Sequence, residues 1–326
     1  MIRRLSVVIP VYRGADTIGR LCATLETTLT GPAAGPAAAG RELEIVLVND
    51  GSPDHSGAVC RQLAAERPHV RFIDLARNFG EHNAVMAGLN HCTGDAVVIL
   101  DDDFQNPPSE VEKLVAAIAA GHDVAWSCYE KKQHHWFRNL GSSFNDRMAT
   151  WMLGKPRDLY LSSFKALSRF TVDEVIRYRG PYPYLDGLIL RVTKNYTTVL
   201  CRASCRHDAR HDGKSGYTLR KLVALWLNMF TTFSALPLRV ASLIGLAVAV
   251  IGCIMALFFL WERIQHPDLE RGWASLMVGM LVLAGIQLMV LGLIGEYLGR
   301  LYLQDSGRPQ FVVRHRVNCQ APRRDA

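Results

Sequence analysis

The sequence predicts an α/β fold with a mostly parallel sheet, followed by an apolar helical region, and three observations support this. Strand-like and helix-like hydrophobic patterns alternate over residues 5–129, as in parallel sheets covered by helices. Polar clusters follow four of the expected strands. Later in the chain, two long stretches, 240–261 and 272–295, contain no charged residue.

The elements of the expected sheet follow in chain order from hydrophobic periodicity and turn residues. Strands are predicted over 5–12, 43–52, 70–76, 95–100 and 123–129, and the second of them ends in turn residues. Helices are predicted over 15–29, 54–66, 80–92 and 108–121, the last beginning with proline and ending with glycine. Residues 31–40, GPAAGPAAAG, have the composition of a flexible loop.

The two uncharged stretches predict a pair of transmembrane helices, at about 238–261 and 272–298. At about 1.5 Å per residue, each can cross the roughly 30 Å hydrocarbon layer of a membrane. The alternative is a pair of buried core helices. This is disfavoured because two long uncharged stretches occur in one hairpin. Residues 216–236 are expected to form an amphipathic helix in the membrane interface, or else an ordinary core helix. We therefore expect a first domain over 1–215, a membrane region over 237–300, and a tail over 301–326 that is loosely structured from Arg308 onward.

Lysine and arginine flank the apolar hairpin unevenly, and this predicts its orientation. The connector ERIQHPDLER (262–271) carries only two arginines, whereas cations gather at the outer ends of the hairpin: Arg220, Lys221, Arg239, Arg300, Arg308, Arg314 and Arg316. Both termini and the first domain should then face the cytoplasm, on the inner membrane. The net charge of +7 fits attraction to an anionic lipid surface, and no basic-aromatic motif indicates nucleic-acid binding.

The eight cysteines should be reduced thiols in that compartment. Cys201, Cys205, His207 and His211 are potential zinc ligands, but structural zinc sites usually separate their ligand pairs more widely. A strand end followed by a basic loop is the favoured interpretation of this segment.

Polar clusters of the first domain are expected to meet at one edge of the sheet, because ligands bind beyond the carboxyl ends of parallel strands. The clusters are Tyr12 after the first strand, NDGSPD (49–54), RNFGEHN (77–83) and DDDFQNPP (101–108). No glycine-rich dinucleotide motif follows the first strand, and the chain has no P-loop motif.

Three consecutive acids, Asp101, Asp102 and Asp103, end the fourth predicted strand. Carboxylates at this place indicate Mg²⁺ or Mn²⁺, hard ions that prefer oxygen ligands, and the alternative is a solvated acidic turn. In an extended chain, residues i, i+2 and i+4 point the same way. Asp101, Asp103 and Gln105 are therefore expected to converge on the metal, whereas Asp102 points elsewhere.

Five segments of the chain carry a resemblance to a known family: VVIPVY (7–12), VNDGSPD (48–54), RNFGEHNAVMAGL (77–89), TGDAVVILDDDFQNPP (93–108) and GEYLGRLY (295–302). The sequence resembles the family-2 glycosyltransferases of the GT-A, Rossmann-like fold. Within them it is similar to the polyprenyl-phosphate glycosyltransferases, relatives of dolichol-phosphate mannose synthase and of bacterial undecaprenyl-phosphate sugar transferases. The resemblance covers nearly the whole chain.

The resemblance implies donor-side roles for several residues. Two acids and the glutamine are expected to surround the metal and the nucleotide diphosphate, and these are Asp101, Asp103 and Gln105, the two acids being catalytic as well. The nucleotide-sugar is expected to contact Pro10, Tyr12, Asp50, Arg77 and Asp102. Gly14 departs from the family pattern, because relatives carry a glutamate there, and this puts one ribose or base contact in doubt.

The resemblance also implies acceptor-side roles. Arg138 and Ser142, in WFRNLGSS, resemble contacts to the acceptor phosphate, and Lys165 stands where an arginine is common. Relatives often read GxSKY where this chain has GKSGY (213–217), so the cation has moved two places earlier. The residues expected around that phosphate are Arg138, Ser142, Lys165, Arg210, Lys214 and Ser215, with Arg138 and Lys214 as catalytic cations. For each cation, a solvated surface charge is the alternative.

The implied reaction is an inverting transfer of a sugar from a nucleotide-sugar, expected to be UDP-linked, to undecaprenyl phosphate at the cytoplasmic membrane face. The second pKa of a phosphate monoester is about 6, so the acceptor oxygen is already ionised and needs alignment by cations rather than a general base. The product would serve envelope glycan modification, such as that of lipopolysaccharide, after a separate flippase moves it. A homo-oligomer is also expected, with a tetramer as one form.

Two rival functions follow from the same sequence. A processive polysaccharide synthase would be expected to carry more spans and a QxxRW motif, which does not occur here. A non-enzymatic scaffold or flippase subunit would be expected to have lost the acids that hold the metal, and these acids are present. The sequence does not identify the sugar.

Overall fold

The computed structural model describes residues 2–30, 40–129, 159, 161–180, 183–201, 272–305 and 309–319, with single positions between 243 and 265. The chain divides into two compact units. The first contains residues 1–215 and 308–326, and the second contains residues 216–307.

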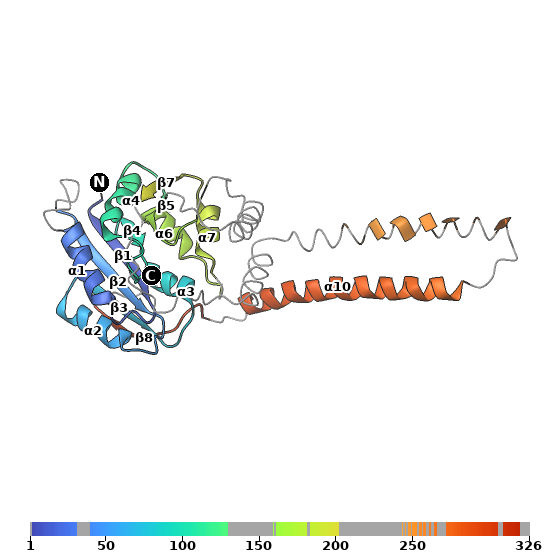
Figure 1. Cartoon of the computed structure of the whole chain (residues 1–326), viewed down its shortest axis with the longest axis horizontal. Helices are drawn as coiled ribbons and strands as arrows, with labels where there is room; N and C mark the ends of the chain where they lie inside the picture. The colour runs from blue at the N-terminus through green and yellow to red at the C-terminus, as the bar shows by residue number, and fades with distance from the viewer. Residues whose placement is uncertain are drawn as a thin grey trace. The chain divides into compact units, whose positions relative to one another are not determined.

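The first unit is built on an eight-stranded sheet with the order β7-β5-β6-β4-β1-β2-β3-β8 (Figure 1). Its strands are β1 (Arg4–Val11), β2 (Glu42–Asn49), β3 (Val70–Leu75), β4 (Ala96–Ile99), β5 (Val124–Tyr129), β6 (Lys165–Ser168), β7 (Tyr196–Cys201) and β8 (Val313–Val317). The pairs β1–β2, β1–β4, β2–β3 and β5–β7 are parallel. Strands β6 and β8 run antiparallel to their neighbours. The prediction of a mostly parallel sheet is therefore confirmed.

Helices cover both faces of this sheet and form two hydrophobic layers. One layer contains α1 (Ile18–Leu29), α2 (Ser56–Glu66) and α4 (Val111–Ala119), and the other contains α3 (Glu81–His91), α6 (Arg169–Val175) and α7 (Leu185–Val192). Successive residues of a strand point to opposite faces. In β1, Leu5, Val7 and Ile9 accordingly pack in the first layer, while Val8 packs in the second. The short helix η3 (Pro108–Glu110) leads into α4.

The helices α1 and α2 begin later than the periodicity predicts, at Ile18 and Ser56. The residues before them belong to turns, because the carbonyl of Gly14 accepts from the N–H groups of Thr17 and Ile18 and the Asp54 carboxylate accepts from the Ser56 N–H. These turns lengthen the loops after β1 and β2, where the polar clusters lie.

The strand β8 corrects the expectation of a loosely structured tail from Arg308 onward. Val313–Val317 pairs with β3, and Asn318 donates hydrogen bonds to the carbonyls of Ala64 and Val70 at 2.6 and 2.9 Å. The segment VRHRV has three exposed basic residues between two half-buried valines, and charged side chains are typical of an edge strand.

The described part of the second unit includes the 33-residue helix α10 (Trp273–Asp305), which is about 50 Å long at 1.5 Å per residue. Many large apolar side chains of this unit are exposed, among them Leu257, Leu288 and Leu291 at 62–70%. Within the described residues, no helix meets the combined requirement of length and apolar character for crossing a membrane.

Candidate functional site

The loops after β1, β2 and β4 lie side by side at the carboxyl edge of the sheet. The register pairs Val11 with Asn49 and Val8 with Ile99, so these parallel strands end close together. The polar clusters after the strands therefore gather at one edge, as the sequence predicts. Ligands of open α/β sheets bind at this edge, which makes it the candidate site.

The turn between β1 and α1 is held by serines of the next loop. The N–H groups of Arg13 and Gly14 donate to the hydroxyls of Ser52 and Ser56, at 3.3 and 2.9 Å. Arg13 adopts a left-handed φ of 58°, and the Tyr12 ring is 43% exposed. Pro10 is half-buried at the end of β1. The predicted nucleotide contacts Pro10 and Tyr12 thus border the edge, with the Tyr12 ring open to solvent.

Asp50 is buried and binds the backbone of the β3–α3 turn. Its carboxylate accepts from the N–H groups of Phe79 and Gly80 at 2.7 and 2.9 Å. Burial raises the pKa of Asp50, and the two backbone hydrogen bonds oppose that rise. The carboxylate predicted to meet the nucleotide is thus already used to hold the turn that carries Arg77.

Arg77 is exposed, and its guanidinium lies over the Phe79 ring at 4.7 Å from the ring centroid. Gly51, with a φ of +61°, lets the β2–α2 loop approach the backbone of Arg77 so closely that a Cβ would overlap it. The predicted nucleotide residues Asp50 and Arg77 are therefore brought together by two adjacent loops.

The three consecutive acids have different surroundings. Asp101 accepts from Asn106 Nδ2 at 3.2 Å and from the Ser163 hydroxyl at 2.6 Å. Asp103 accepts from the backbone N–H of Gln105 at 3.1 Å. Asp102 is only 8% exposed and accepts from the Tyr12 N–H at 3.2 Å.

The three acids do not lie in an extended strand, so the alternation predicted for them is wrong. Strand β4 ends at Ile99, and residues 102–106 form turns and bends in which Phe104 has a left-handed φ of 58°. Side chains in such a turn do not follow the period of an extended strand. Asp102 does contact a different loop from Asp101, but a tight turn separates them rather than strand alternation.

The side chains of this turn supply the kind of donor atoms that a divalent metal prefers. Asp101 and Asp103 are only partly buried, Gln105 is exposed, and all three supply the oxygen ligands that Mg²⁺ and Mn²⁺ prefer. Within the described residues, no three His, Cys, Asp or Glu side chains lie together as a metal-binding group. The predicted set has only two carboxylates, and water and diphosphate oxygens commonly complete such sites.

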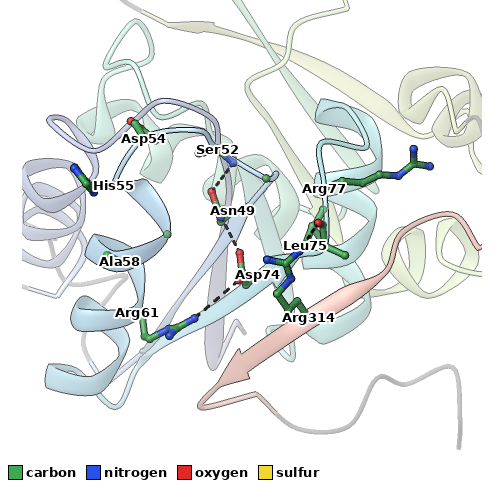
Figure 2. A pocket seen from close by; sticks show the side chains of 13 residues that line it. Asn49, Ser52, Asp54, His55, Ala58, Arg61, Asp74, Leu75, Arg77 and Arg314 are labelled. Carbon is green, nitrogen blue, oxygen red and sulfur yellow. Dashed lines mark hydrogen bonds and ion pairs between the residues drawn. The ribbon is translucent and has the colours of Figure 1, made fainter.

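A cavity of about 420 Å³ lies beyond the ends of β2 and β3 (Figure 2). Asp74 lies at its centre, accepts from Asn49 Nδ2 at 2.8 Å, and is 4.0 Å from a guanidinium nitrogen of Arg61. Arg314 of β8 also lines the cavity and donates to the carbonyl of Ala76 at 2.9 Å. Figure 2 shows the Arg61 guanidinium directed at Asp74, whereas Arg77 points away.

The sequence prediction missed Arg61, Asp74 and Arg314. Asp74 could have been found, since it is the last polar residue of the third predicted strand. Arg314 could not, because it lies in a short, basic segment that shows no clear strand pattern.

Lys165 has a buried partner and does not face solvent. Its ammonium forms an ion pair with Asp186, and both side chains are at most 10% exposed. Asp186 also accepts from the Trp126 indole N–H at 3.1 Å. This geometry favours a structural role for Lys165 over the expected contact with an acceptor phosphate. The pKa of nearby His82 is lowered, mainly by burial.

The other residues predicted for the acceptor side lie outside the described residues. These are Arg138, Ser142, Arg210, Lys214 and Ser215. Of the potential zinc ligands, Cys201 is described and is buried at the end of β7, where a strand end was expected.

Comparison with known proteins identifies the family. Residues 6–176, just over half of the chain, match the family described as glycosyl transferase family 2. The chain belongs to glycosyltransferase family 2. Residues 236–301 of this glycosyltransferase match a second family, described as the GtrB C-terminal hairpin. The resemblance inferred from the motifs is confirmed.

Curated relatives span the whole glycosyltransferase. An undecaprenyl-phosphate 4-deoxy-4-formamido-L-arabinose transferase of Edwardsiella ictaluri is 32% identical, over 98% of this chain and 96% of the relative. The protein of the same name from Proteus mirabilis is also 32% identical, over 99% and 97%. Among solved structures, glucosyl-3-phosphoglycerate synthase from Mycobacterium tuberculosis matches with a TM-score of 0.50 and 18% identity, over 71% of this chain and 77% of that one. This likeness supports the GT-A fold.

Proposed function

We propose that this glycosyltransferase moves a sugar from a nucleotide-sugar, UDP-linked, to undecaprenyl phosphate at the cytoplasmic face of the inner membrane. The observation that carries the proposal is the pair of accessible carboxylates, Asp101 and Asp103. They lie at the carboxyl edge of the sheet, where the strands β1, β2 and β3 also end. The full-length relatives named for undecaprenyl-phosphate sugar transfer support the acceptor.

The donor diphosphate is proposed to lie over the turn after β4. Asp101, Asp103 and Gln105 would hold Mg²⁺ or Mn²⁺ there, which would neutralise the charge that develops on the leaving diphosphate. Pro10, Tyr12 and Arg77 border the nucleoside side, with Asp50 holding the loop that carries Arg77. The cavity beside Asp74 and Arg314 is large enough to take part of the nucleoside.

The acceptor phosphate is proposed to meet the cations of the sequence segments 138–142 and 210–215. Its oxygen is already ionised near neutrality, so Arg138, Arg210 and Lys214 need only align and screen it, with Ser142 and Ser215 as hydrogen-bond donors. A single in-line displacement then inverts the anomeric centre. This mechanism requires no general base on the chain.

Attachment to the membrane is proposed for the second unit. Its large apolar side chains are exposed, and residues 272–295 carry no charge. The chain leaves the first unit after Ser215 and re-enters it at Arg308. Any membrane region between these points must therefore start and end on the same side, which supports placing both termini on one face of the membrane. A homo-oligomer and a separate flippase remain part of this proposal, and so does a role of the product in envelope glycan modification.

The test is sugar transfer by the purified full chain in lipid vesicles that contain undecaprenyl phosphate, with Mn²⁺ and a panel of nucleotide-sugars. We expect release of a nucleoside diphosphate with one donor, dependent on the lipid, and formation of a lipid-phosphate-linked sugar. The matched control is the Asp101→Ala, Asp103→Ala chain. The absence of transfer from every donor would contradict the proposal and favour a scaffold or flippase subunit.

A further inference from the structure

The middle acid of the triplet, Asp102, has its carboxylate in the turn that follows β1. Its Oδ2 accepts from the N–H of Tyr12 at 3.2 Å, and the side chain is 8% exposed. The two residues are 90 positions apart in the sequence. A buried carboxylate is costly unless it accepts hydrogen bonds, so this contact fixes where the turn can lie.

Gly14 makes room for this carboxylate. A Cβ on Gly14 would overlap Asp102 Oδ2 and lie 3.2 Å from Asp102 Cγ. The glycine is needed for space alone, because its φ lies outside the left-handed region, whereas its neighbour Arg13 adopts a left-handed φ. Gly14 and Asp102 therefore fit together as a pair, in which the side chain of one occupies the space that the other leaves.

The same turn is held from its other side by the β2–α2 loop. Ser52 and Ser56 accept from the N–H groups of Arg13 and Gly14, and Ser52 donates to the carbonyl of Val11 at 3.3 Å. Asp102 is the contact that comes from the loop after β4. It links the turn carrying Tyr12 to the turn carrying Asp101 and Asp103.

We propose that Asp102 is a positioning residue for the donor nucleotide, which sets the Tyr12 turn against the β4 turn and is not a ligand of the metal. The inference rests on the proposed transfer from a nucleotide-sugar and adds to it the residue that couples the nucleoside side of the site to the diphosphate side. The exposed Tyr12 ring is the group whose placement depends on this contact.

The test compares four variants of the full chain: Asp102→Ala, Asp102→Asn, Gly14→Ala and the double variant Gly14→Ala with Asp102→Ala. The readouts are KM for the donor, kcat, the Mn²⁺ concentration at half-maximal rate and the Kd of uridine diphosphate. Asp16→Ala is the matched control, because Asp16 is an exposed acid of the same loop.

We expect Asp102→Ala to raise KM and Kd about tenfold, the scale of one hydrogen bond to a charged group, with kcat and the Mn²⁺ requirement nearly unchanged. Asp102→Asn keeps an oxygen acceptor and should restore most of the affinity. Gly14→Ala should also weaken binding, but the double variant should bind no more weakly than Asp102→Ala, because the space is then empty. Asp16→Ala should behave as the wild type.

Two results would overturn the inference while leaving the proposed function intact. In the first, the wild-type chain transfers sugar, and the losses of donor affinity in Gly14→Ala and Asp102→Ala add up in the double variant. The other is a raised Mn²⁺ requirement in Asp102→Asn, which would make Asp102 a metal ligand. If Asp102→Ala fails to fold, the Mn²⁺ requirement of Asp102→Asn still tests the metal alternative, and an unchanged donor Kd in Gly14→Ala would overturn the inference. A wild-type chain without any transfer contradicts the proposed function itself.

Discussion

At the residue scale, neighbouring acids of identical chemistry have different surroundings. Asp101 and Asp103 are partly buried and contact groups of the β4 turn and of Ser163, whereas Asp102 is buried against the turn after β1. Of the three acids, only Asp101 and Asp103 are accessible to a cation that bridges a diphosphate. The difference in exposure, rather than charge, separates a candidate metal ligand from a positioning residue.

Replacing Asp103 or Asp101 with alanine is therefore expected to remove most of the turnover, because each loss takes one of the two carboxylates of the proposed metal site. The rate against Mn²⁺ concentration checks this, with Asp102→Ala as the comparison that retains turnover at saturating donor. Equal losses of turnover at all three positions would contradict the distinction.

Lys165 and Asp186 allow a second prediction at this scale. Asp186→Ala leaves a buried ammonium without its partner and the Trp126 indole without its acceptor, so we expect a loss of about 3–5 kcal/mol in the free energy of unfolding. Chemical denaturation of the purified chain measures it. Glu174→Ala is the matched control, because its ion pair with Arg177 is largely exposed and should cost less than about 1 kcal/mol. A stable Asp186→Ala chain would argue instead for Lys165 as a phosphate contact.

At the element scale, the site is made by loops that hold one another in place. The β1–α1 turn is bound by Ser52 and Ser56 on one side and by Asp102 on the other, while Asp50 holds the β3–α3 turn. The strand β8 adds Arg314 to the cavity at the ends of β2 and β3. The C-terminal segment thereby contributes to the cavity proposed for the nucleoside.

Arg314→Ala is expected to raise the donor KM several-fold, because it removes a cation from the cavity proposed for the nucleoside. Donor titrations at saturating lipid measure the change. Arg316→Ala is the control, because it removes the same charge from the same strand but Arg316 does not line the cavity. It should leave KM unchanged. Equal effects of the two variants would place the donor elsewhere.

At the scale of the whole molecule, the chain consists of a folded α/β unit interrupted by an apolar one. The first unit resumes at Arg308, so its β8 strand comes from sequence that follows the second unit. The second unit exposes many large apolar side chains, which a protein in water rarely does in one region. This exposed apolar surface is the basis of the proposed membrane attachment.

We therefore expect the full chain to remain with cell membranes after washing at high salt and at alkaline pH, because burial of apolar side chains, unlike charge attraction, is not screened by salt. Fractionation followed by detection of the chain is the measurement. Release by salt alone would show that the basic charge, rather than the apolar unit, holds it at the surface.

The predictable part of the fold rests on local patterns. The alternation of strands and helices over residues 5–129 could be predicted because the periods of 2 and 3.6 residues are visible within each segment. Strand β6 was missed, since its four residues KALS carry too short a pattern. Strand β8 was missed because its arginines concealed its pairing with β3.

Local sequence patterns are enough to establish the α/β class, the family, the acids at the end of β4 and the uncharged stretches, because each of these depends on residues that are neighbours in the chain. Only the tertiary structure decided the partner of Asp102, the partner of Lys165 and the return of Arg314 to the cavity. These contacts join residues 90, 21 and 238 positions apart. Such pairs depend on which strand ends meet at the edge of the sheet, and no pattern within a segment records that.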